Sequence, residues 1–141
     1  MTTDDLKAFV SGYIDAALFS EPIGDEFAQA WADCYDEQPP SPGDTSLQSF
    51  GFEAEALAPE ALAACIVDCE AFVEDNAEPL AGYDSYEAGS LFLFTRNGHG
   101  RFEWESFNAT GYELTDAAKP YGEVNFYADA ETQLVHVYPE G

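Results

Sequence analysis

A net charge of −24 on 141 residues is the feature that most constrains this chain, because any compact fold must hold those charges close together. The sequence has 28 Asp and Glu residues against four Lys and Arg residues. Direct binding to nucleic acid or to an anionic membrane needs a basic surface, so the charge argues against both. A core is still possible, since 46% of the residues are hydrophobic and 15% are aromatic. The charge therefore predicts a folded acidic protein whose partner is basic.

The negative charge is concentrated in the first 88 residues, which hold 20 acids and one base. Residues 89–141 hold 8 acids and three bases, which are Arg96, Arg101 and Lys119. Duplex DNA carries one charge per about 1.7 Å of its axis, so 24 charges in a line match about 40 Å of duplex. A globular domain of this length is about 35–40 Å wide. Acids along one face would therefore resemble a short duplex, although solubility and adaptation to high salt are alternative reasons for the charge.

Three amphipathic helices are expected before residue 80. Apolar residues recur at helical spacing over 4–19 and over 25–35. The clearest helix covers 59–76, where Pro59 suits the first helical position and one stripe is apolar: Leu62, Cys65, Ile66, Cys69, Phe72 and Val73. Three prolines and a glycine interrupt the pattern at 38–44 and predict a Pro-rich loop or insertion at about 36–56.

The pattern changes to that of strands after Gly89. The apolar run Leu91–Phe94 is followed by Asn97-Gly98 and by the alternating residues 102–104, which together predict a hairpin. A short helix is expected over 114–120, and alternation around 124–128 and 135–137 predicts a second hairpin. We predict a single α+β domain, 1–141, with N-terminal helices packed on one face of a C-terminal antiparallel sheet of about four strands.

Residues suited to catalysis or metal binding are few. Three cysteines, Cys34, Cys65 and Cys69, suit reduced thiols better than a disulfide framework. Cys65 and Cys69 lie on the apolar stripe, which favours burial over zinc binding, and no calcium-loop spacing is present. His136 alternates with two valines and is expected to face solvent. No serine sits in a nucleophile elbow, so we expect no metal, no cofactor and no enzyme activity.

The N-terminal segment gives an expectation about location. It carries acids where a secretory signal would carry bases, and the sequence has no run of 18 apolar residues. A cytoplasmic protein is therefore expected.

Several blocks of this sequence are similar to those of a known protein family. They are YIDAAL at 13–18, LAPE at 57–60, Asp68-Cys69, Ala88-Gly89, TRNGHG at 95–100 and LTDAAKPYGEV at 114–124. Together they resemble a family of small acidic proteins of phages and prophages, over roughly residues 10–22 and 56–128. The chain departs from the family pattern at about 24–55 and after Arg101. The family carries no assigned activity, so the resemblance implies only a phage setting within a host cell.

The first candidate site is a set of acidic side chains proposed to contact a partner. They come from the loop around residue 36 and from the helix that begins at residue 59: Asp36, Glu37, Glu60, Asp68, Glu70, Glu74, Asp75 and Glu78.

The second candidate site is the expected hairpin tip formed by Arg96, Asn97, Gly98, His99 and Arg101, with Glu103 nearby. Two arginines and a histidine there would hold an anion or assist proton transfer. The alternative is turn chemistry, with positive φ at Asn97, Gly98 and Gly100. Because the chain otherwise avoids bases, a buried bridge from Arg96 to a helix carboxylate is a further interpretation.

These observations favour a non-enzymatic phage protein that binds and blocks a basic, nucleic-acid-binding defence protein of the host. It would act as anti-restriction and anti-CRISPR DNA mimics do, through electrostatic steering and competition for a basic cleft. One alternative is an accessory protein whose charge serves only solubility or salt adaptation. Another is a small enzyme that uses the Arg96–His99 hairpin. The sequence is compatible with a monomer or a dimer.

Overall fold

The computed structural model describes residues 3–20, 47, 54–102, 109–129, 132 and 134–138. These residues form five α-helices, two short 3-10 helices and one two-stranded antiparallel hairpin. In chain order the elements are α1 (Thr3–Ser20), η3 (Ala54–Ala56), α3 (Pro59–Asp75), α4 (Ala77–Leu80), α5 (Ser85–Arg96), α6 (Ala109–Ala118), η5 (Lys119–Tyr121), β1 (Asn125–Asp129) and β2 (Leu134–Tyr138). The predicted helix over 25–35, most of the Pro-rich loop, and the candidate residues Asp36 and Glu37 lie outside this description.

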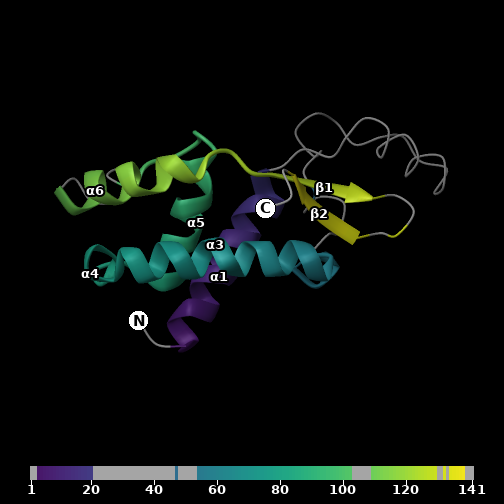
Figure 1. Ribbon diagram of the computed structural model, residues 1–141, viewed down its shortest axis with the longest axis horizontal. Helices are drawn as coiled ribbons and strands as arrows, with labels where there is room; N and C mark the ends of the chain where they lie inside the picture. The colour runs from purple at the N-terminus through teal and green to yellow at the C-terminus, as the bar shows by residue number, and fades with distance from the viewer. Residues whose placement is uncertain are drawn as a thin grey trace.

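The described part of the chain is mostly helical, and the predicted sheet of about four strands is wrong. Helix α3 lies across α1 and α5, α6 lies at one end of the molecule, and the hairpin lies at the other end (Figure 1). The predicted helices over 4–19 and 59–76 are confirmed as α1 and α3. The predicted C-terminal hairpin is also confirmed, as β1 paired with β2. The helix expected over 114–120 begins earlier, as α6, and ends in η5.

Helix α5 replaces the strand that was expected over Leu91–Phe94. The side chain of Asp84 accepts a hydrogen bond from the backbone N–H of Glu87 at 3.1 Å and so caps the start of this helix. At the other end, His99 N–H donates to the carbonyl of Phe94 and Gly98 N–H donates to that of Thr95. With φ of +77° at Gly98, this is a Schellman motif. The Asn-Gly pair therefore ends a helix, and residues 95–101 form no hairpin tip.

Two glycines allow α1 and α5 to pack with their backbones in contact. A Cβ on Gly12 would overlap the carbonyl oxygen of Tyr86, and a Cβ on Gly89 would overlap that of Phe9. The Ser90 hydroxyl, one residue further along α5, donates to the Gly12 carbonyl at 3.0 Å. The crossing of α1 and α5 thus requires glycine at both positions, since any Cβ would force the helices apart.

Aromatic rings fill the core between these helices. The rings of Phe72 and Phe92 stack with centroids 4.1 Å apart, and Phe9 lies about 6 Å from both. Tyr121 meets the edge of Phe92 at 5.1 Å. Such pairs contribute about 0.5–1.5 kcal/mol each, in addition to the stabilisation from the apolar area that they bury.

The buried stripe of α3 is rotated from the predicted one: Ala61 is fully buried, whereas Leu62 is 38% exposed.

The hairpin packs on the helices through one face. Phe126 pairs with Val137 and Ala128 pairs with Val135, and three of these side chains are buried (Phe126, Val135 and Val137). Beside β2, Leu57 forms a parallel bridge to Val135, and Ala58 N–H donates to the Val135 carbonyl at 2.8 Å. The residues that precede α3 therefore hold the hairpin beside the N-terminal end of this helix.

Candidate functional site

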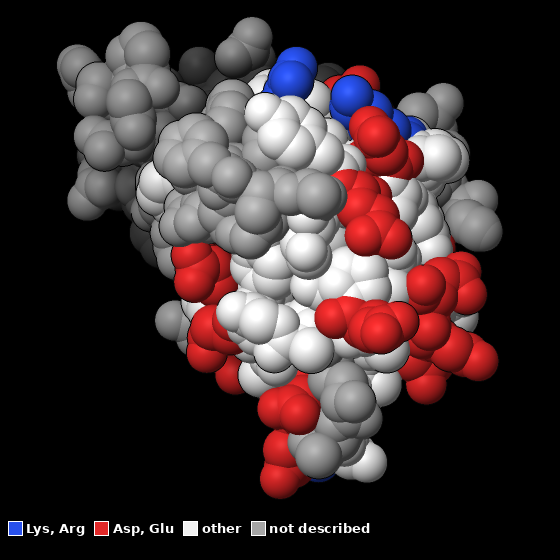
Figure 2. Space-filling model, turned by 90° about the vertical axis from the view of Figure 1, so that its left-hand side faces the viewer, with Lys and Arg blue, Asp and Glu red and all other residues white. Residues whose placement is uncertain are grey.

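The acidic residues predicted on α3 and α4 are mostly exposed. Glu70, Glu74 and Asp75 project from α3 into solvent, as does Glu78 from α4. Glu60 is also exposed, at the other end of α3. Figure 2 looks onto the end of the molecule that lies at the left of Figure 1. Asp and Glu side chains are spread over this end, and Lys and Arg side chains lie mainly along its upper edge. We call Glu70, Glu74, Asp75 and Glu78 the acidic end of α3–α4.

This acidic end lies where helix electrostatics disfavour it. The C-terminal turn of a helix carries partial negative charge, and a carboxylate there is repelled by about 0.3–1 kcal/mol. Helix α3 ends with Glu74 and Asp75 and has no base in its last turn. Glu70 and Glu74 are four residues apart, a like-charge spacing that costs a few tenths of a kcal/mol more. The positions of these acids therefore lower the stability of α3.

Asp68 differs from its neighbours because it pairs with Arg96. Their Nη1 and Oδ2 atoms are 2.8 Å apart, and the Arg96 side chain is only 6% exposed. The interpretation of Arg96 as a buried bridge to a helix carboxylate is confirmed. Because Asp68 is occupied in this way, it belongs to a structural network more than to the acidic end.

Arg96 joins four segments of the fold. Its Nη1 also donates to the Tyr13 hydroxyl of α1 at 2.9 Å. Its Nε donates to the Gly122 carbonyl at 2.8 Å and its Nη2 to the Tyr121 carbonyl at 2.9 Å. The guanidinium carbon lies 5.6 Å from the centre of the Tyr121 ring and 5.7 Å from that of Phe92. Four of its five N–H groups are thus engaged, and they tie α1, α3 and α5 to the segment that leads into the hairpin.

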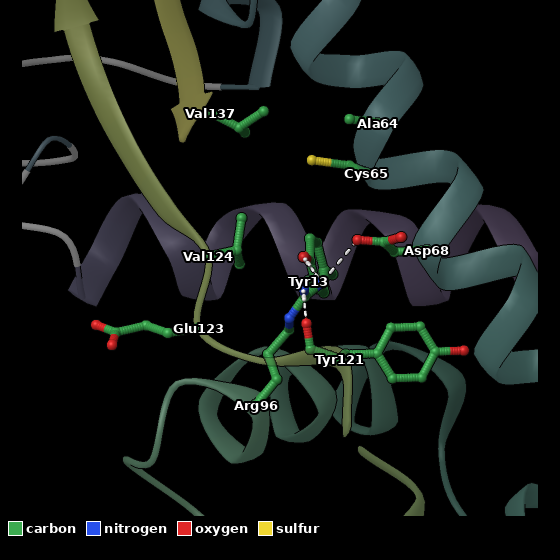
Figure 3. Close-up of a pocket in the computed structure, with 9 residues that line it drawn as sticks. All are labelled: Tyr13, Ala64, Cys65, Asp68, Arg96, Tyr121, Glu123, Val124 and Val137. Atoms are coloured by element: carbon green, nitrogen blue, oxygen red, sulfur yellow. Dashed lines mark hydrogen bonds and ion pairs between the residues drawn. The ribbon is translucent and has the colours of Figure 1, made fainter. Parts of the chain in front are cut away.

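A cavity of about 220 Å³ opens beside this network. Figure 3 shows it between α1, α3 and the strands, with Arg96 and Tyr121 below and Cys65 and Val137 above. Ala64, Val124 and Val137 give it apolar walls, whereas the Glu123 side chain points away from it. The cavity therefore combines an ion pair and a phenol with an apolar upper half.

Burial holds one phenol and two thiols near the cavity in their neutral forms. Burial raises the pKa of Tyr13, although Arg96 opposes the shift. Burial, followed by the charge of Asp68, raises the pKa of Cys65 to about 12. Burial also raises the pKa of Cys69. Both thiols are therefore protonated at neutral pH and poorly nucleophilic. The predicted burial of these cysteines in the core is confirmed.

The other residues of the predicted hairpin tip have separate roles. Positive φ was expected at Asn97, Gly98 and Gly100. It holds at Gly98 and is wrong at Asn97, which has φ of −91°, and at Gly100. The side chain of Asn97 donates to the Val124 carbonyl at 2.9 Å and accepts from the Val124 N–H at 2.8 Å. His99 and Arg101 are exposed, and Glu103 lies outside the described residues. The structure therefore does not assemble these residues into one anion site.

Replacing Asn97 with alanine should lower the free energy of unfolding by about 2 kcal/mol, because both backbone groups of the buried Val124 lose their partner. Asn97→Asp should cost at least as much, since a carboxylate still accepts from the Val124 N–H but repels the Val124 carbonyl and the C-terminal end of α5. Urea unfolding followed by circular dichroism measures both values. Equal stability of the wild type and Asn97→Ala would contradict this role.

His136 lies on the outer side of β2, as its alternation predicts, but it is largely covered. Its side chain is 19% exposed, and its ring stacks on Tyr127 with centroids 5.4 Å apart. Its Nδ1 lies 3.3 Å from Oε1 of Glu60, a residue of the predicted acidic surface. Glu60 therefore faces the hairpin and lies apart from the acidic end of α3–α4.

No group of three His, Cys, Asp or Glu side chains within the described residues is placed to hold a metal ion. None of the helices in the described ranges is both long and apolar enough to cross a membrane. Comparison of the chain with protein-family models, curated protein sequences and solved structures finds no match. The resemblance to phage proteins stays a prediction.

Tyr13 and Tyr121 belong to the Arg96 network, although neither was predicted from the sequence. Tyr13 lies 83 residues from Arg96 in the sequence, and Tyr121 takes part through its backbone carbonyl as well as its ring. The only signal was indirect: Tyr13 and Tyr121 both fall within the sequence blocks that resemble the phage family. Every residue type has a backbone carbonyl, so the sequence gives no sign of this contact.

Proposed function

We propose that this protein binds a basic protein of a host cell and occupies its nucleic-acid-binding surface, as a DNA mimic does. The part of the molecule that would make contact is the acidic end of α3–α4. Opposite charges on the two surfaces would speed their encounter and would disfavour partners without a basic cleft. The activity requires no cofactor and no catalytic residue.

The single observation that supports this proposal best is a long stretch of mostly exposed acids that contains no Lys or Arg. From Ala54 to Thr95 the chain has nine acids and no Lys or Arg. Eight of the nine are exposed, and they are Glu55, Glu60, Glu70, Glu74, Asp75, Glu78, Asp84 and Glu87. The next base along the chain, Arg96, is buried in its bridge to Asp68. The field of these acids therefore reaches solvent and is available to a partner.

The energetic cost of the acidic end also supports a use for it. Solubility would be served equally by acids at helix N-termini, where they stabilise the helix. Here α1, α3, α4 and α6 all lack a base in their last turns, and α3 ends with two acids. Residues that a binding surface needs are often retained even though they lower the stability of the fold, and these acids fit that pattern.

Neutralising the end of α3 should therefore stabilise the protein. The double variant Glu74→Gln, Asp75→Asn should raise the free energy of unfolding by about 1 kcal/mol at low salt, because repulsion with the helix terminus and between neighbouring acids is removed. The gain should shrink in 0.5 M salt, which screens exposed charges. Chemical unfolding at two salt concentrations measures it. A loss of stability at low salt would show that these acids support the helix instead.

A pull-down from bacterial lysate tests the proposed function. The tagged protein is incubated with nuclease-treated lysate at low salt, washed with a salt gradient, and the retained proteins are identified by mass spectrometry. We expect one nucleic-acid-binding protein to be enriched and to be displaced by added duplex DNA. A broad set of basic proteins that elutes together at modest salt would favour the alternative in which the charge serves solubility only.

A further inference from the structure

The cavity beside Arg96 has room for a small group. Its volume of about 220 Å³ is below the roughly 300–1,000 Å³ of sites for drug-sized ligands. It is several times the roughly 30 Å³ that a water molecule occupies in the liquid. A side chain or a molecule with a handful of heavy atoms fits this space.

Two polar groups that line the cavity, the Tyr13 hydroxyl and the Asp68 carboxylate, have unused hydrogen-bonding capacity. The Tyr13 hydroxyl accepts from Arg96, but no described residue accepts its proton, although Tyr13 is only 1% exposed. Asp68 receives Arg96 on Oδ2, and no described residue donates to its other oxygen, Oδ1. Both groups bond to the same nitrogen of Arg96, at 2.9 and 2.8 Å, so the Tyr13 hydroxyl and the Asp68 carboxylate lie side by side. A buried donor without an acceptor is unfavourable, and a matching ligand would satisfy it.

The charges around the cavity select for an uncharged group. The positive charge of Arg96 and the negative charge of Asp68 offset each other. An anion would meet Asp68 and the field of the surrounding acids, and a cation would meet the guanidinium of Arg96. Ala64, Val124 and Val137 suit an alkyl portion.

We propose that this cavity binds a carboxamide, a small uncharged group that carries both an acceptor and a donor. The carbonyl oxygen accepts the proton of the Tyr13 hydroxyl, and the amide N–H donates to the carboxylate of Asp68. The alkyl chain packs against Val124 and Val137. The side chain of Gln in a partner protein and a free aliphatic amide both present this chemistry.

Titration with three probes of equal length tests the proposal. Butyramide, butyrate and butylammonium are added separately to ¹⁵N-labelled full-length protein, and the amide signals of Cys65, Val124 and Val137 are followed. Butyramide should shift these signals in a saturable manner with millimolar affinity, and the two charged probes should not. Absence of saturable shifts with butyramide, or equal shifts with all three probes, would overturn the proposal.

A variant that fills the cavity provides the matched control. Ala64→Leu places a larger side chain in the cavity without removing a hydrogen-bonding group, and it should reduce butyramide affinity at least tenfold. Ala63→Leu changes the neighbouring exposed residue of α3 and should leave the affinity unchanged. Tyr13→Phe, which removes the proton donor, should weaken binding in the same way as Ala64→Leu. Undiminished binding to Ala64→Leu would place the probe elsewhere and overturn the proposal.

A capped tripeptide with Gln at its centre distinguishes the two sources of the amide. Tighter binding of the peptide than of butyramide would identify a partner side chain, and tighter binding of butyramide would identify a free amide. The corresponding tripeptide with Glu should not bind, and its binding with equal affinity would contradict selection for an uncharged group. These titrations use no host protein, so their outcome is independent of the pull-down result.

Discussion

Replacing Gly89 with alanine should destabilise the protein by about 3 kcal/mol or more. Alanine favours an isolated helix over glycine by about 1 kcal/mol, so intrinsic propensity predicts the opposite sign. The added Cβ, however, would overlap the Phe9 carbonyl oxygen and lie 2.8 Å from the carbon of that carbonyl. Both atoms belong to the backbone of α1, so relief requires the two helices to separate and their aromatic core to loosen.

Gly82→Ala is the matched control for this prediction. Gly82 is exposed between α4 and α5, and a Cβ there would meet no atom within 4 Å. The stability of the Gly82→Ala variant should equal that of the wild type or slightly exceed it. Urea denaturation of the three proteins gives the comparison. Wild-type stability in Gly89→Ala would mean that α1 and α5 do not cross as described.

Replacing Arg96 with methionine should lower the free energy of unfolding by about 3 kcal/mol or more. The change preserves much of the apolar stem but removes the four hydrogen bonds to Tyr13, Asp68, Tyr121 and Gly122. Removing one partner of a largely buried ion pair typically costs about 3–5 kcal/mol, because the other partner is left unpaired. Asp68 is 37% exposed, so water compensates for part of the loss and the lower end of that range is expected.

Two variants separate the geometry of Arg96 from its charge. Arg96→Lys keeps the positive charge but lacks the planar fork that donates in four directions, so it should recover only a minor part of the loss. Lys119→Met removes the same charge from an exposed residue whose nearest carboxylate, Asp116, is 4.0 Å away. Its effect should stay within about 0.5 kcal/mol. Full stability of Arg96→Lys would contradict a role for the guanidinium geometry.

The sequence was sufficient to predict those elements whose periodicity is unambiguous. Helices α1 and α3 have apolar residues at a spacing of three and four, and α3 begins with Pro59 at a position suited to it. The alternation around Phe126 and Val137 identified the hairpin of β1 and β2. Each of these elements buries one face only. Its apolar residues therefore recur at one spacing, which is that of a helix or that of a strand.

Helix α5 was mistaken for a strand because it is covered on more than one side. Phe92 and Leu93 are fully buried, and the flanking Leu91 and Phe94 are partly buried, so the run of four apolar residues shows no period. Such a run fits a buried strand and a buried helix equally well. The signals that distinguish them lay at its ends, where Asp84 precedes Glu87 by three residues and Gly98 follows Arg96.

The candidate site was predictable only in part, because its contacts join distant segments. A bridge from Arg96 to a helix carboxylate followed from the scarcity of bases, but α3 offers several acids, and the selection of Asp68 depends on how α3 crosses α5. The same packing determines the close helix contacts at Gly12 and Gly89. It also determines the two hydrogen bonds between Asn97 and Val124. Local pattern carries no information about these pairings.

The most direct test of the proposed binding function compares two triple variants in the pull-down. Glu70→Gln, Glu74→Gln, Glu78→Gln removes three of the four charges of the acidic end of α3–α4. Asp4→Asn, Glu55→Gln, Glu123→Gln removes the same charge from exposed residues elsewhere. The account predicts that the first variant loses the DNA-displaceable partner and the second retains it, with both folded by circular dichroism. Equal retention of that partner by both variants would contradict the assignment of the binding surface to the acidic end.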